Sequence, residues 1–528
     1  MNTAGGAGNV TTTQGVSGVS VSTALSVANG SVFDIADKTL SIAGTSTLNA
    51  SGSLNVSNAS SVVNYTRADG TAQTVLGLTY AGTLNLSGAT SAKDFSANAS
   101  AATMTHSGGA LTVNHNLDVS ASGTFATITD ITGAMTFGAG ATTASINTIT
   151  NISAGSLTNN ATGAALSVAT LTSNAGTINA AAAGGISFTS ATNGAGTIEA
   201  TSTGNLTFAA LGGNSGTIQT TNSGSLLFTG AASNAGTITA AAGSGAITFS
   251  NTLAHTAGTI TAGSGNASFA NTVTTSSGAV INGGAHTLAF AGNLDNSGTV
   301  QSTAGGTVNF SADFVNNVGT LTLASTSTWN YDGNSQAIAG GVGITYGNLN
   351  TKTGGTKTAL GDISVAGNFD NGGGSDATVT TNMKTFALAV TGTRDNASST
   401  LEFSGLTNGL SFTFTTPAAG TVVYNGTTVD AATQQIASGD YYQLQFSGNA
   451  PKSFVTNTTT TTGAGVSIGA NVTVNQPQTA GTTILNINAG GLTLAATTST
   501  MVNDGTINVT GNLDNSGTLT NNGTITVQ

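Results

Sequence analysis

Hydrophobic and polar residues alternate over short stretches of this chain, and the stretches come in pairs. Within 174–193, the run Thr177-Ile-Asn is polar, apolar, polar, and the run Ile186-Ser-Phe is apolar, polar, apolar. A period of two is that of a half-buried β-strand. Gly and Asn around both runs favour the positive φ angles of tight corners. Each such segment therefore predicts two short strands, here with Ile178, Ile186 and Phe188 turned inward.

This pattern recurs with a nearly constant period. Phenylalanines recur at almost equal intervals, at Phe188, Phe208, Phe228, Phe249, Phe269, Phe290 and Phe310. A Gly-Thr-Ile type step keeps a similar spacing, at Gly176, Gly196, Gly216, Gly236, Gly258, Gly278, Gly298 and Gly319. A period of this length, about 20 residues, is typical of solenoids, in which each repeat packs only against its neighbours. Equivalent strands are expected to pair in parallel, about 4.8 Å apart.

We therefore expect an all-β fold, an elongated single-stranded parallel β-helix (β-solenoid) with about 20 residues per coil. Residues 1–30 lack a clear register and are expected to form an N-terminal lead or cap, and residues 31–528 the solenoid. Gly, Ser, Thr and Asn are abundant and disfavour helices, and no stretch predicts an amphipathic helix.

Charged residues are scarce. The chain has 8 Lys and Arg against 19 Asp and Glu, a formal net charge of -11, and no basic residue from Asp94 to Thr351. Nucleic acid is therefore not an expected partner. Cysteine is absent, which excludes disulfides and thiolate metal sites. No apolar run is long enough for a transmembrane helix. A surface of hydroxyl and amide groups with few charges is expected of a secreted or surface-displayed protein.

Three related segments, 65–93, 331–357 and 424–452, interrupt the regular pattern and hold all seven tyrosines. Each has a first Tyr, then a Gln, a second Tyr, and a Lys shortly after the strand that follows. The first tyrosines are Tyr65, Tyr331 and Tyr424, the glutamines Gln73, Gln336 and Gln435, the second tyrosines Tyr80, Tyr346 and Tyr442, and the lysines Lys93, Lys357 and Lys452.

Two interpretations of these segments stay open. One is a platform of aromatic rings beside a cation, as in a sugar site, where Tyr80, Trp329, Tyr346 and Tyr442 would contact a glycan or a partner. The other is a recurrent variant coil whose Tyr rings and Lys stems pack a corner.

A second recurrence is the run Gly-Asn-Leu-Asp-Asn-Ser-Gly-Thr, found at 292–299 and 511–518, with a near copy at 367–372. Asp295, Asp514 and Asp370 are the acids in these copies. A calcium site usually gathers several oxygen ligands, often more than one of them acidic, whereas each copy offers one acid. An Asn/Asp turn with side chain to backbone hydrogen bonds is expected instead.

Together, the Gly-Asn-Leu-Asp-Asn-Ser-Gly-Thr copies, the Asn-Ala-Gly-Thr-Ile steps and the Tyr/Lys segments resemble the repeats of secreted bacterial parallel β-helix surface proteins. Filamentous-haemagglutinin-like adhesins and autotransporter passengers are the nearest comparison. The resemblance covers most of the chain and implies a right-handed parallel β-helix, surface display, and a role in adhesion, biofilm or cell-surface coating. No secretion domain of the two-partner type is recognised, which suggests an excerpt or a differently exported protein.

Some parallel β-helices cleave polysaccharides, and that chemistry would require two carboxylates about 5 to 10 Å apart. On this coil they would lie one turn apart in register. The nearest pairs, Asp94 with Asp118 and Asp295 with Asp313, have no basic partner in register. His106 and His115 lack an evident third ligand. No enzyme activity, catalytic residue, cofactor or metal is therefore expected.

Ice binding is a weaker possibility, because it would need a flat threonine array. Thr237 with Thr239 and Thr259 with Thr261 form such pairs, but only over two coils.

The expected function is structural: an extracellular or cell-surface protein of bacterial type in adhesion, biofilm matrix or surface coating. The alternating run Thr524-Ile-Thr-Val-Gln528 suggests end-to-end strand pairing, as in a self-assembling filament or S-layer-like subunit. Self-association is thus the first expected partnership, with glycans or host surfaces second. The alternative is a polysaccharide-binding or polysaccharide-degrading β-helix protein.

Overall fold

The computed structural model comprises two compact units, Met1–Ala270 and Asn271–Gln528. It describes residues 9–11, 17–48, 52–240, 243, 245–263, 265–316, 319–372, 378–405, 420–427, 434–436, 439–446, 452–454, 458–468, 471–474, 484–487, 492–494, 500–503 and 506–528. Among these residues the named secondary-structure elements are all β-strands, and none is a helix. The strands pair in parallel and stack into a β-solenoid whose turns are about 21 residues apart, so the expected fold class is confirmed.

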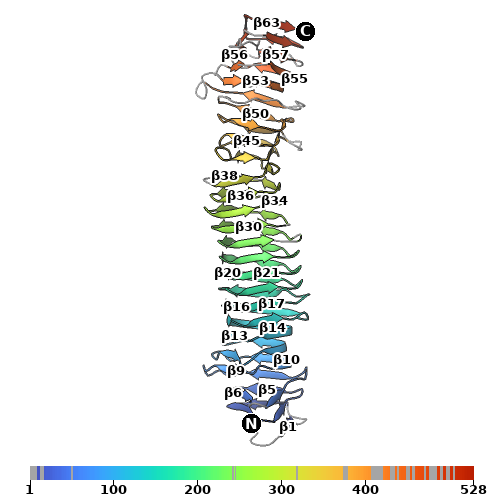
Figure 1. Cartoon of the computed structure of the whole chain (residues 1–528), viewed down its shortest axis with the longest axis vertical. Coiled ribbons are helices and arrows are strands. Elements are labelled where there is room, and N and C mark those ends of the chain that lie inside the picture. The colour runs from blue at the N-terminus through green and yellow to red at the C-terminus, as the bar shows by residue number, and fades with distance from the viewer. Residues whose placement is uncertain are drawn as a thin grey trace. The chain divides into compact units, whose positions relative to one another are not determined.

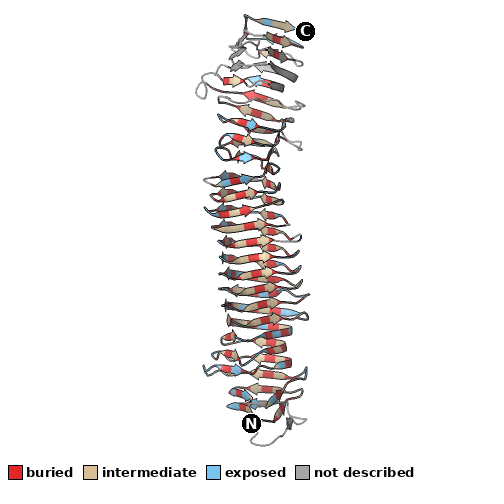
Figure 2. Ribbon diagram, viewed as in Figure 1, coloured by how far each residue is buried: buried red, intermediate tan, exposed pale blue. Residues whose placement is uncertain are grey.

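Within the first unit, consecutive coils contribute equivalent strands that lie one over the next (Figure 1). One ladder runs through β19 (Thr177–Ala180), β21 (Thr197–Ala200), β24 (Thr217–Thr220), β27 (Thr237–Ala240) and β30 (Gly258–Ala262). Its inward residues form a buried aliphatic column of Ile178, Ile198, Ile218, Ile238 and Ile260. The strict alternation of buried and less buried residues, visible along the strands in Figure 2, confirms the strand pattern.

The phenylalanines form a second column in that unit, on β20 (Ile186–Asn193), β22 (Leu206–Phe208), β25 (Leu226–Phe228), β28 (Ile247–Phe249) and β31 (Ala267–Phe269). Their rings are stacked, with centroids 4.5 to 5.3 Å apart in the successive pairs from Phe188 to Phe269. In the second unit Phe290 and Phe310 stack at 5.5 Å. The Phe spacing is therefore core packing.

A third column in the first unit is polar although it is buried. The Nδ2 of Asn174 donates to Oδ1 of Asn193 (2.8 Å), Asn193 donates to Asn214 (2.7 Å), and Asn214 donates to Asn234 (2.6 Å). Asn234 in turn contacts Nδ1 of His255 at 3.1 Å. Stacked amides satisfy one another, so this column can lie inside the coils without the penalty of an unpaired polar group.

The stack begins before residue 31. Strands β1 (Asn9–Thr11), β2 (Gly18–Val21) and β3 (Ala24–Val27) pair in parallel with β4 (Val32–Asp34), β5 (Thr39–Ile42) and β6 (Thr45–Leu48). The described part of the expected lead or cap, 9–11 and 17–30, therefore already contributes a coil.

In the second unit a ladder runs through β37 (Thr307–Phe310), β40 (Thr328–Tyr331), β43 (Asn348–Thr351), β46 (Phe369–Asn371) and β49 (Arg394–Asp395). Two of its coils differ in length: one regular turn separates Leu349 from its partner Phe369, whereas a longer coil separates Phe369 from its partner Arg394. Because of the longer coil, the residues that lie opposite each other on this ladder differ from those that a constant period would pair.

Candidate functional site

The first two Tyr/Lys segments each contain a pair of buried tyrosine hydroxyls. In the first segment Tyr80 OH donates to the carbonyl of Leu76 (2.8 Å), and the Leu76 N–H donates to Tyr65 OH (3.1 Å). The two hydroxyls are 3.2 Å apart. Since the Tyr80 hydroxyl donates its hydrogen to the Leu76 carbonyl, the Tyr65 hydroxyl is the donor in the bond between the two hydroxyls. Burial raises the pKa of both hydroxyls, so they stay protonated.

The second segment repeats the arrangement. Tyr346 OH donates to the carbonyl of Ala339 (2.7 Å), the Ala339 N–H donates to Tyr331 OH (3.3 Å), and the hydroxyls are 2.7 Å apart. Burial raises the pKa of both tyrosines here as well. The two tyrosines thus hold the backbone of a corner in both copies.

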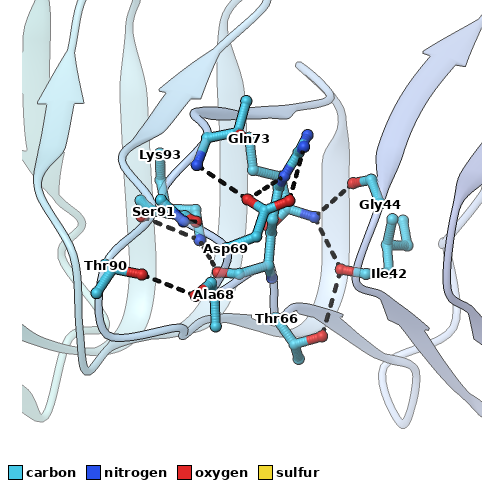
Figure 3. Close-up of polar contacts among 12 residues, drawn as sticks. Ile42, Gly44, Thr66, Ala68, Asp69, Gln73, Thr90, Ser91 and Lys93 are labelled. Carbon is cyan, nitrogen blue, oxygen red and sulfur yellow. Dashed lines mark hydrogen bonds and ion pairs between the residues drawn. The ribbon is translucent and has the colours of Figure 1, made fainter.

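The glutamine of each segment connects its coil to the preceding one, as Figure 3 shows for Gln73 in the first segment. Gln73 Nε2 donates to the carbonyls of Ile42 and Gly44, both at 2.8 Å, and its Oε1 accepts from the Arg67 N–H at 3.1 Å. Gln336 makes the same three bonds, with Phe310, Ala312 and Gly333, and Gln434 makes them with Phe403, Gly405 and Gly426. In the third segment this residue is Gln434 rather than the expected Gln435, because Gln435 lies on the outward face of β52 (Gln434–Ile436).

The lysine lies opposite the glutamine in strand register in all three segments. Lys93 pairs with Gln73, Lys357 with Gln336, and Lys452 with Gln434. The Lys93 ammonium donates to the carbonyls of Arg67 (3.1 Å) and Ser91 (3.2 Å), as Figure 3 shows for the first segment. The Lys357 ammonium donates to the carbonyls of Gly333, Asn334 and Gly354. Burial lowers the pKa of both, to about 8 at Lys357.

The exposure of the aromatic rings tests whether they could form a sugar-binding platform. Tyr80, Trp329 and Tyr346 are 1%, 0% and 0% exposed. Trp329 Nε1 donates to Ser327 Oγ at 3.2 Å. The three rings therefore pack inside the coils and offer no face on which a sugar could stack. Tyr442 lies in β53 (Gly439–Phe446), and its side chain is outside the described part of the chain.

An open polar hollow of about 380 Å³ lies on the second unit, over β43, β46 and β49. We call it the Asp370 hollow. It is lined by Thr328, Asn348, Asn350, Asn368, Phe369, Asp370, Thr393 and Asp395. All of these side chains except Phe369 are polar. From the sequence, Asp370 was expected only as part of an Asn/Asp turn.

One column of the hollow contains two carboxylates on consecutive rungs. Asn350 pairs with Asp370, and Asp370 pairs with Asp395. Paired residues of adjacent parallel strands lie about 4.8 Å apart. The structure thus brings together an acid pair that the sequence had not identified. The pairs expected to be nearest do not meet in this way: Asp94 pairs with Thr112, and Asp295 pairs with Val315.

The column below the acids is a hydrogen-bonded amide ladder with a fixed direction. Asn330 Nδ2 donates to Asn309 Oδ1 (2.7 Å), and Asn350 Nδ2 donates to Asn330 Oδ1 (2.8 Å). Each amide directs its Nδ2 toward the preceding rung. No hydrogen bond joins Asn350 to Asp370 among the described residues, so the ladder stops at Asn350.

The carboxylate of Asp370 is poorly satisfied. Its Oδ1 is buried and accepts no hydrogen bond from any described residue. Burial raises the pKa of Asp370, and the charge of Asp395 raises it further, while Lys352 opposes the shift. Asp395 Oδ1 accepts from the Ala397 N–H at 2.9 Å. The acid nearer the ladder is therefore the one that lacks a partner.

A second column runs beside the first, two residues earlier on each coil. Asn348 Oδ1 accepts from the Asn368 N–H (2.9 Å), and Asn368 Oδ1 accepts from the Thr393 N–H (3.0 Å). The amide oxygens are thus occupied, whereas the Nδ2 of Asn368 makes no hydrogen bond to the described residues. One column of the hollow presents acceptors, and the other presents a donor.

The two histidines weighed as possible ligands, His106 and His115, lie in different environments. His106 is buried in β12 (Ala99–His106), between Leu86 and Phe125 in register, whereas His115 lies in the turn before β14 (Leu117–Ile131). In the portion of the chain that the structure covers, no three His, Asp or Glu residues are grouped to hold a metal ion.

The threonine array extends further than the two expected coils, but only in one column. Thr177, Thr197, Thr217, Thr237 and Thr259 lie opposite one another in register. The neighbouring column is mixed, with Asn179, Glu199 and Gln219 before Thr239 and Thr261. A flat two-column threonine surface is therefore limited to the last two of these coils.

No family model, curated protein or solved structure matches this chain significantly. The functional proposals below therefore depend on the fold and on the contacts just described. Among the described residues there is also no helix with the length and apolar character to cross a membrane.

Proposed function

We propose that this chain is a structural protein of the bacterial cell surface or the extracellular space, acting in adhesion, biofilm matrix or surface coating. The observation that carries the proposal is the use of its rare large polar side chains. Tyr80, Tyr346, Lys93 and Lys357 are buried and hydrogen-bonded to backbone groups of neighbouring turns. Tyrosine and lysine side chains, which act in catalysis or ligand binding in many proteins, here connect neighbouring coils.

The outward columns support the same proposal. Uncharged hydroxyl groups repeat once per coil along Thr177, Thr197, Thr217, Thr237 and Thr259. A regular series of weak hydrogen-bonding groups suits contact at many points with a surface, where the combined affinity exceeds that of each contact. The lack of Lys and Arg from Asp94 to Thr351 also removes every cleavage site for trypsin-like proteases there.

Self-association by strand pairing is part of the proposal. β63 (Thr524–Val527) pairs with β60 (Thr506–Val509) along one edge, and no strand of the described residues pairs with its other edge. Val509 is 1% exposed, whereas Val527, its partner in register, is 49% exposed. A further strand of the same alternating pattern, added from another chain along this edge, would extend the parallel ladder.

Immunogold electron microscopy on intact and on permeabilised producing cells tests the location. Labelling of intact cells or of their surrounding matrix is expected, and labelling only after permeabilisation would refute a surface role. Negative-stain microscopy of the purified chain tests self-association. Val527→Lys, which places a charge on the open edge, should shorten or abolish filaments, whereas Lys384→Ala, at an exposed position away from that edge, should not. Isolated particles at high concentration would refute the filament.

A further inference from the structure

The Asp370 hollow has more acceptors than its own residues can satisfy. Asn350 Oδ1, the Asp370 carboxylate and the Asp395 carboxylate follow one another in a column. Asp370 Oδ1 is buried without a partner. An unsatisfied buried acceptor usually indicates a missing proton, water, ion or ligand donor. A ligand that binds to this column must therefore carry groups that donate hydrogen bonds.

The adjacent column restricts what that group can be. Asn368 also lines the hollow; its Oδ1 accepts from the Thr393 N–H, and its exposed Nδ2 makes no hydrogen bond to the described residues and remains available as a donor. A bare metal cation could use the acceptors of the first column but not this donor. A hydroxyl group can donate to a carboxylate and accept from an amide at the same time. A pair of neighbouring hydroxyls fits both columns.

We propose that the Asp370 hollow binds an uncharged saccharide, whose neighbouring hydroxyls donate to Asp370 and Asp395 and accept from Asn368. The hollow, at about 380 Å³, is at the small end of ligand sites, which run from about 300 to 1,000 Å³. A monosaccharide or one unit of a longer chain is therefore the ligand. Uronic acids are disfavoured, because their carboxylates would face those of Asp370 and Asp395.

This site is independent of the structural role proposed above. It uses outward side chains of β46 and β49, whereas the structural role depends on the buried segments. Either proposal can fail while the other stands.

Titration of the full chain in EDTA tests the saccharide site. The probes are glucose, galactose, mannose and N-acetylglucosamine, each as the free sugar and as short oligomers, with galacturonate oligomers as the charged comparison. Binding is followed by calorimetry and by saturation-transfer NMR. At least one uncharged sugar should bind saturably at millimolar concentration, and galacturonate should bind more weakly.

Two variants and one control locate the site. Asp370→Asn and Asn368→Asp should each weaken binding by about tenfold or more, the effect of losing a hydrogen bond that involves a charged group or of placing a charge where a donor was. Asp295→Asn changes the acid of the matching run outside the hollow and should leave binding unchanged. Circular dichroism and Tm show that each variant is folded.

Three results would overturn the site. They are no saturable binding of any sugar in the panel, equal binding by Asp370→Asn and the unaltered chain, and preference for galacturonate. A parallel titration with CaCl₂ identifies the competing ligand. Calcium binding that Asp370→Asn abolishes, without any sugar binding, would make this a cation site instead.

Discussion

Gln336 lies directly opposite Lys357 on the adjacent strands β41 (Gln336–Ile338) and β44 (Gly355–Ala359). The Gln336 amide donates to carbonyls of the preceding coil, and the Lys357 ammonium donates to carbonyls of the turn beside Gln336. The pair thus connects successive coils where the chain departs from its regular repeat. The first segment has the same contacts, and in the third Lys452 lies opposite Gln434 in register, so the role of the pair is to hold irregular coils in the stack.

The third copy allows a comparison between neighbouring residues. Gln434→Leu should destabilise the chain by about 2–4 kcal/mol, because the carbonyls of Phe403 and Gly405 lose their donor while buried. Gln435→Leu should have a much smaller effect, because its side chain lies on the outward face of the same strand. Chemical unfolding of both variants measures the difference. Equal losses would contradict the assignment of Gln434 as the equivalent of Gln73 and Gln336.

Lys357→Met keeps the apolar stem and removes the ammonium. Two effects oppose each other: a buried charge disappears, but three carbonyls lose their donor. Hydrogen bonds to a charged group contribute about 1.5–3 kcal/mol each, so the loss is larger, and a net destabilisation of about 2 kcal/mol is expected at neutral pH. Lys384→Met, at an exposed lysine, is the control and should be close to neutral. Thermal unfolding measures both.

Lys357 also makes stability depend on pH. Its pKa is about 8 in the folded chain and 10.5 when unperturbed. Between these values the unfolded chain binds more protons, so the contribution of this group to stability rises with pH. The rise should be present in the unaltered chain and absent in Lys357→Met. A contribution that stays constant or falls with pH over this interval would contradict the lowered pKa of Lys357.

The columns of Phe and Ile could be predicted from the sequence because equal coil lengths place like residues opposite each other. Phe188 and Phe208 are separated by one regular turn and stack as expected. The acid pair could not be predicted in the same way. The coil from Asp370 to Asp395 is longer than the regular turn, so a constant period places another residue opposite Asp370. Register after an insertion is set by three-dimensional pairing.

The burial of polar side chains could not be predicted from the sequence pattern either. The asparagines of the Asn-Ala-Gly-Thr-Ile steps, such as Asn174 and Asn234, were expected at corners, yet both side chains are buried inside the coils. These amides can be buried because the adjacent coils present polar partners in register. The same reason explains Tyr80 and Tyr346, whose hydroxyls are satisfied by backbone groups that the sequence does not show to be near.

His106 is the opposite case, a buried side chain that the stack does not satisfy. It is 3% exposed, and neither ring nitrogen has a hydrogen-bond partner of ordinary geometry. His106→Leu should stabilise the chain by about 1–3 kcal/mol, because an apolar residue then lies between Leu86 and Phe125. His115→Leu, in a turn, is the control. Loss of stability in His106→Leu would indicate an undetected partner of the ring.

The pH dependence of the same variant gives an independent measurement. Burial lowers the pKa of His106 below 6.5, the nearby Lys93 lowers it further, and only the Gly108 backbone favours the charged form. Below pH 6.5 the unfolded chain therefore binds more protons, and the unaltered chain loses stability as pH falls. In His106→Leu this part of the acid sensitivity should disappear. Thermal unfolding from pH 7 to pH 5 compares the two chains.

Asp370→Asn tests the hollow through stability rather than binding. The new Nδ2 can donate to Asn350 Oδ1 and so continue the ladder that starts at Asn309. The variant also removes a carboxylate whose Oδ1 is buried without a partner. A gain of about 1 kcal/mol is expected from one added hydrogen bond. Asp295→Asn, in the matching run, should give no comparable gain.

The gain should depend on pH in a defined direction. The pKa of Asp370 is raised above 3.8 in the folded chain, chiefly by burial, so the protonated acid favours folding. That contribution is complete below pH 3.8 and is lost as pH rises through the folded pKa. The advantage of Asp370→Asn should therefore be small in acid and larger at neutral pH. An advantage that does not change with pH would show that the Asp370 carboxylate is solvated. Stability gained together with saccharide binding lost would show that Asp370 interrupts the ladder because it serves a ligand.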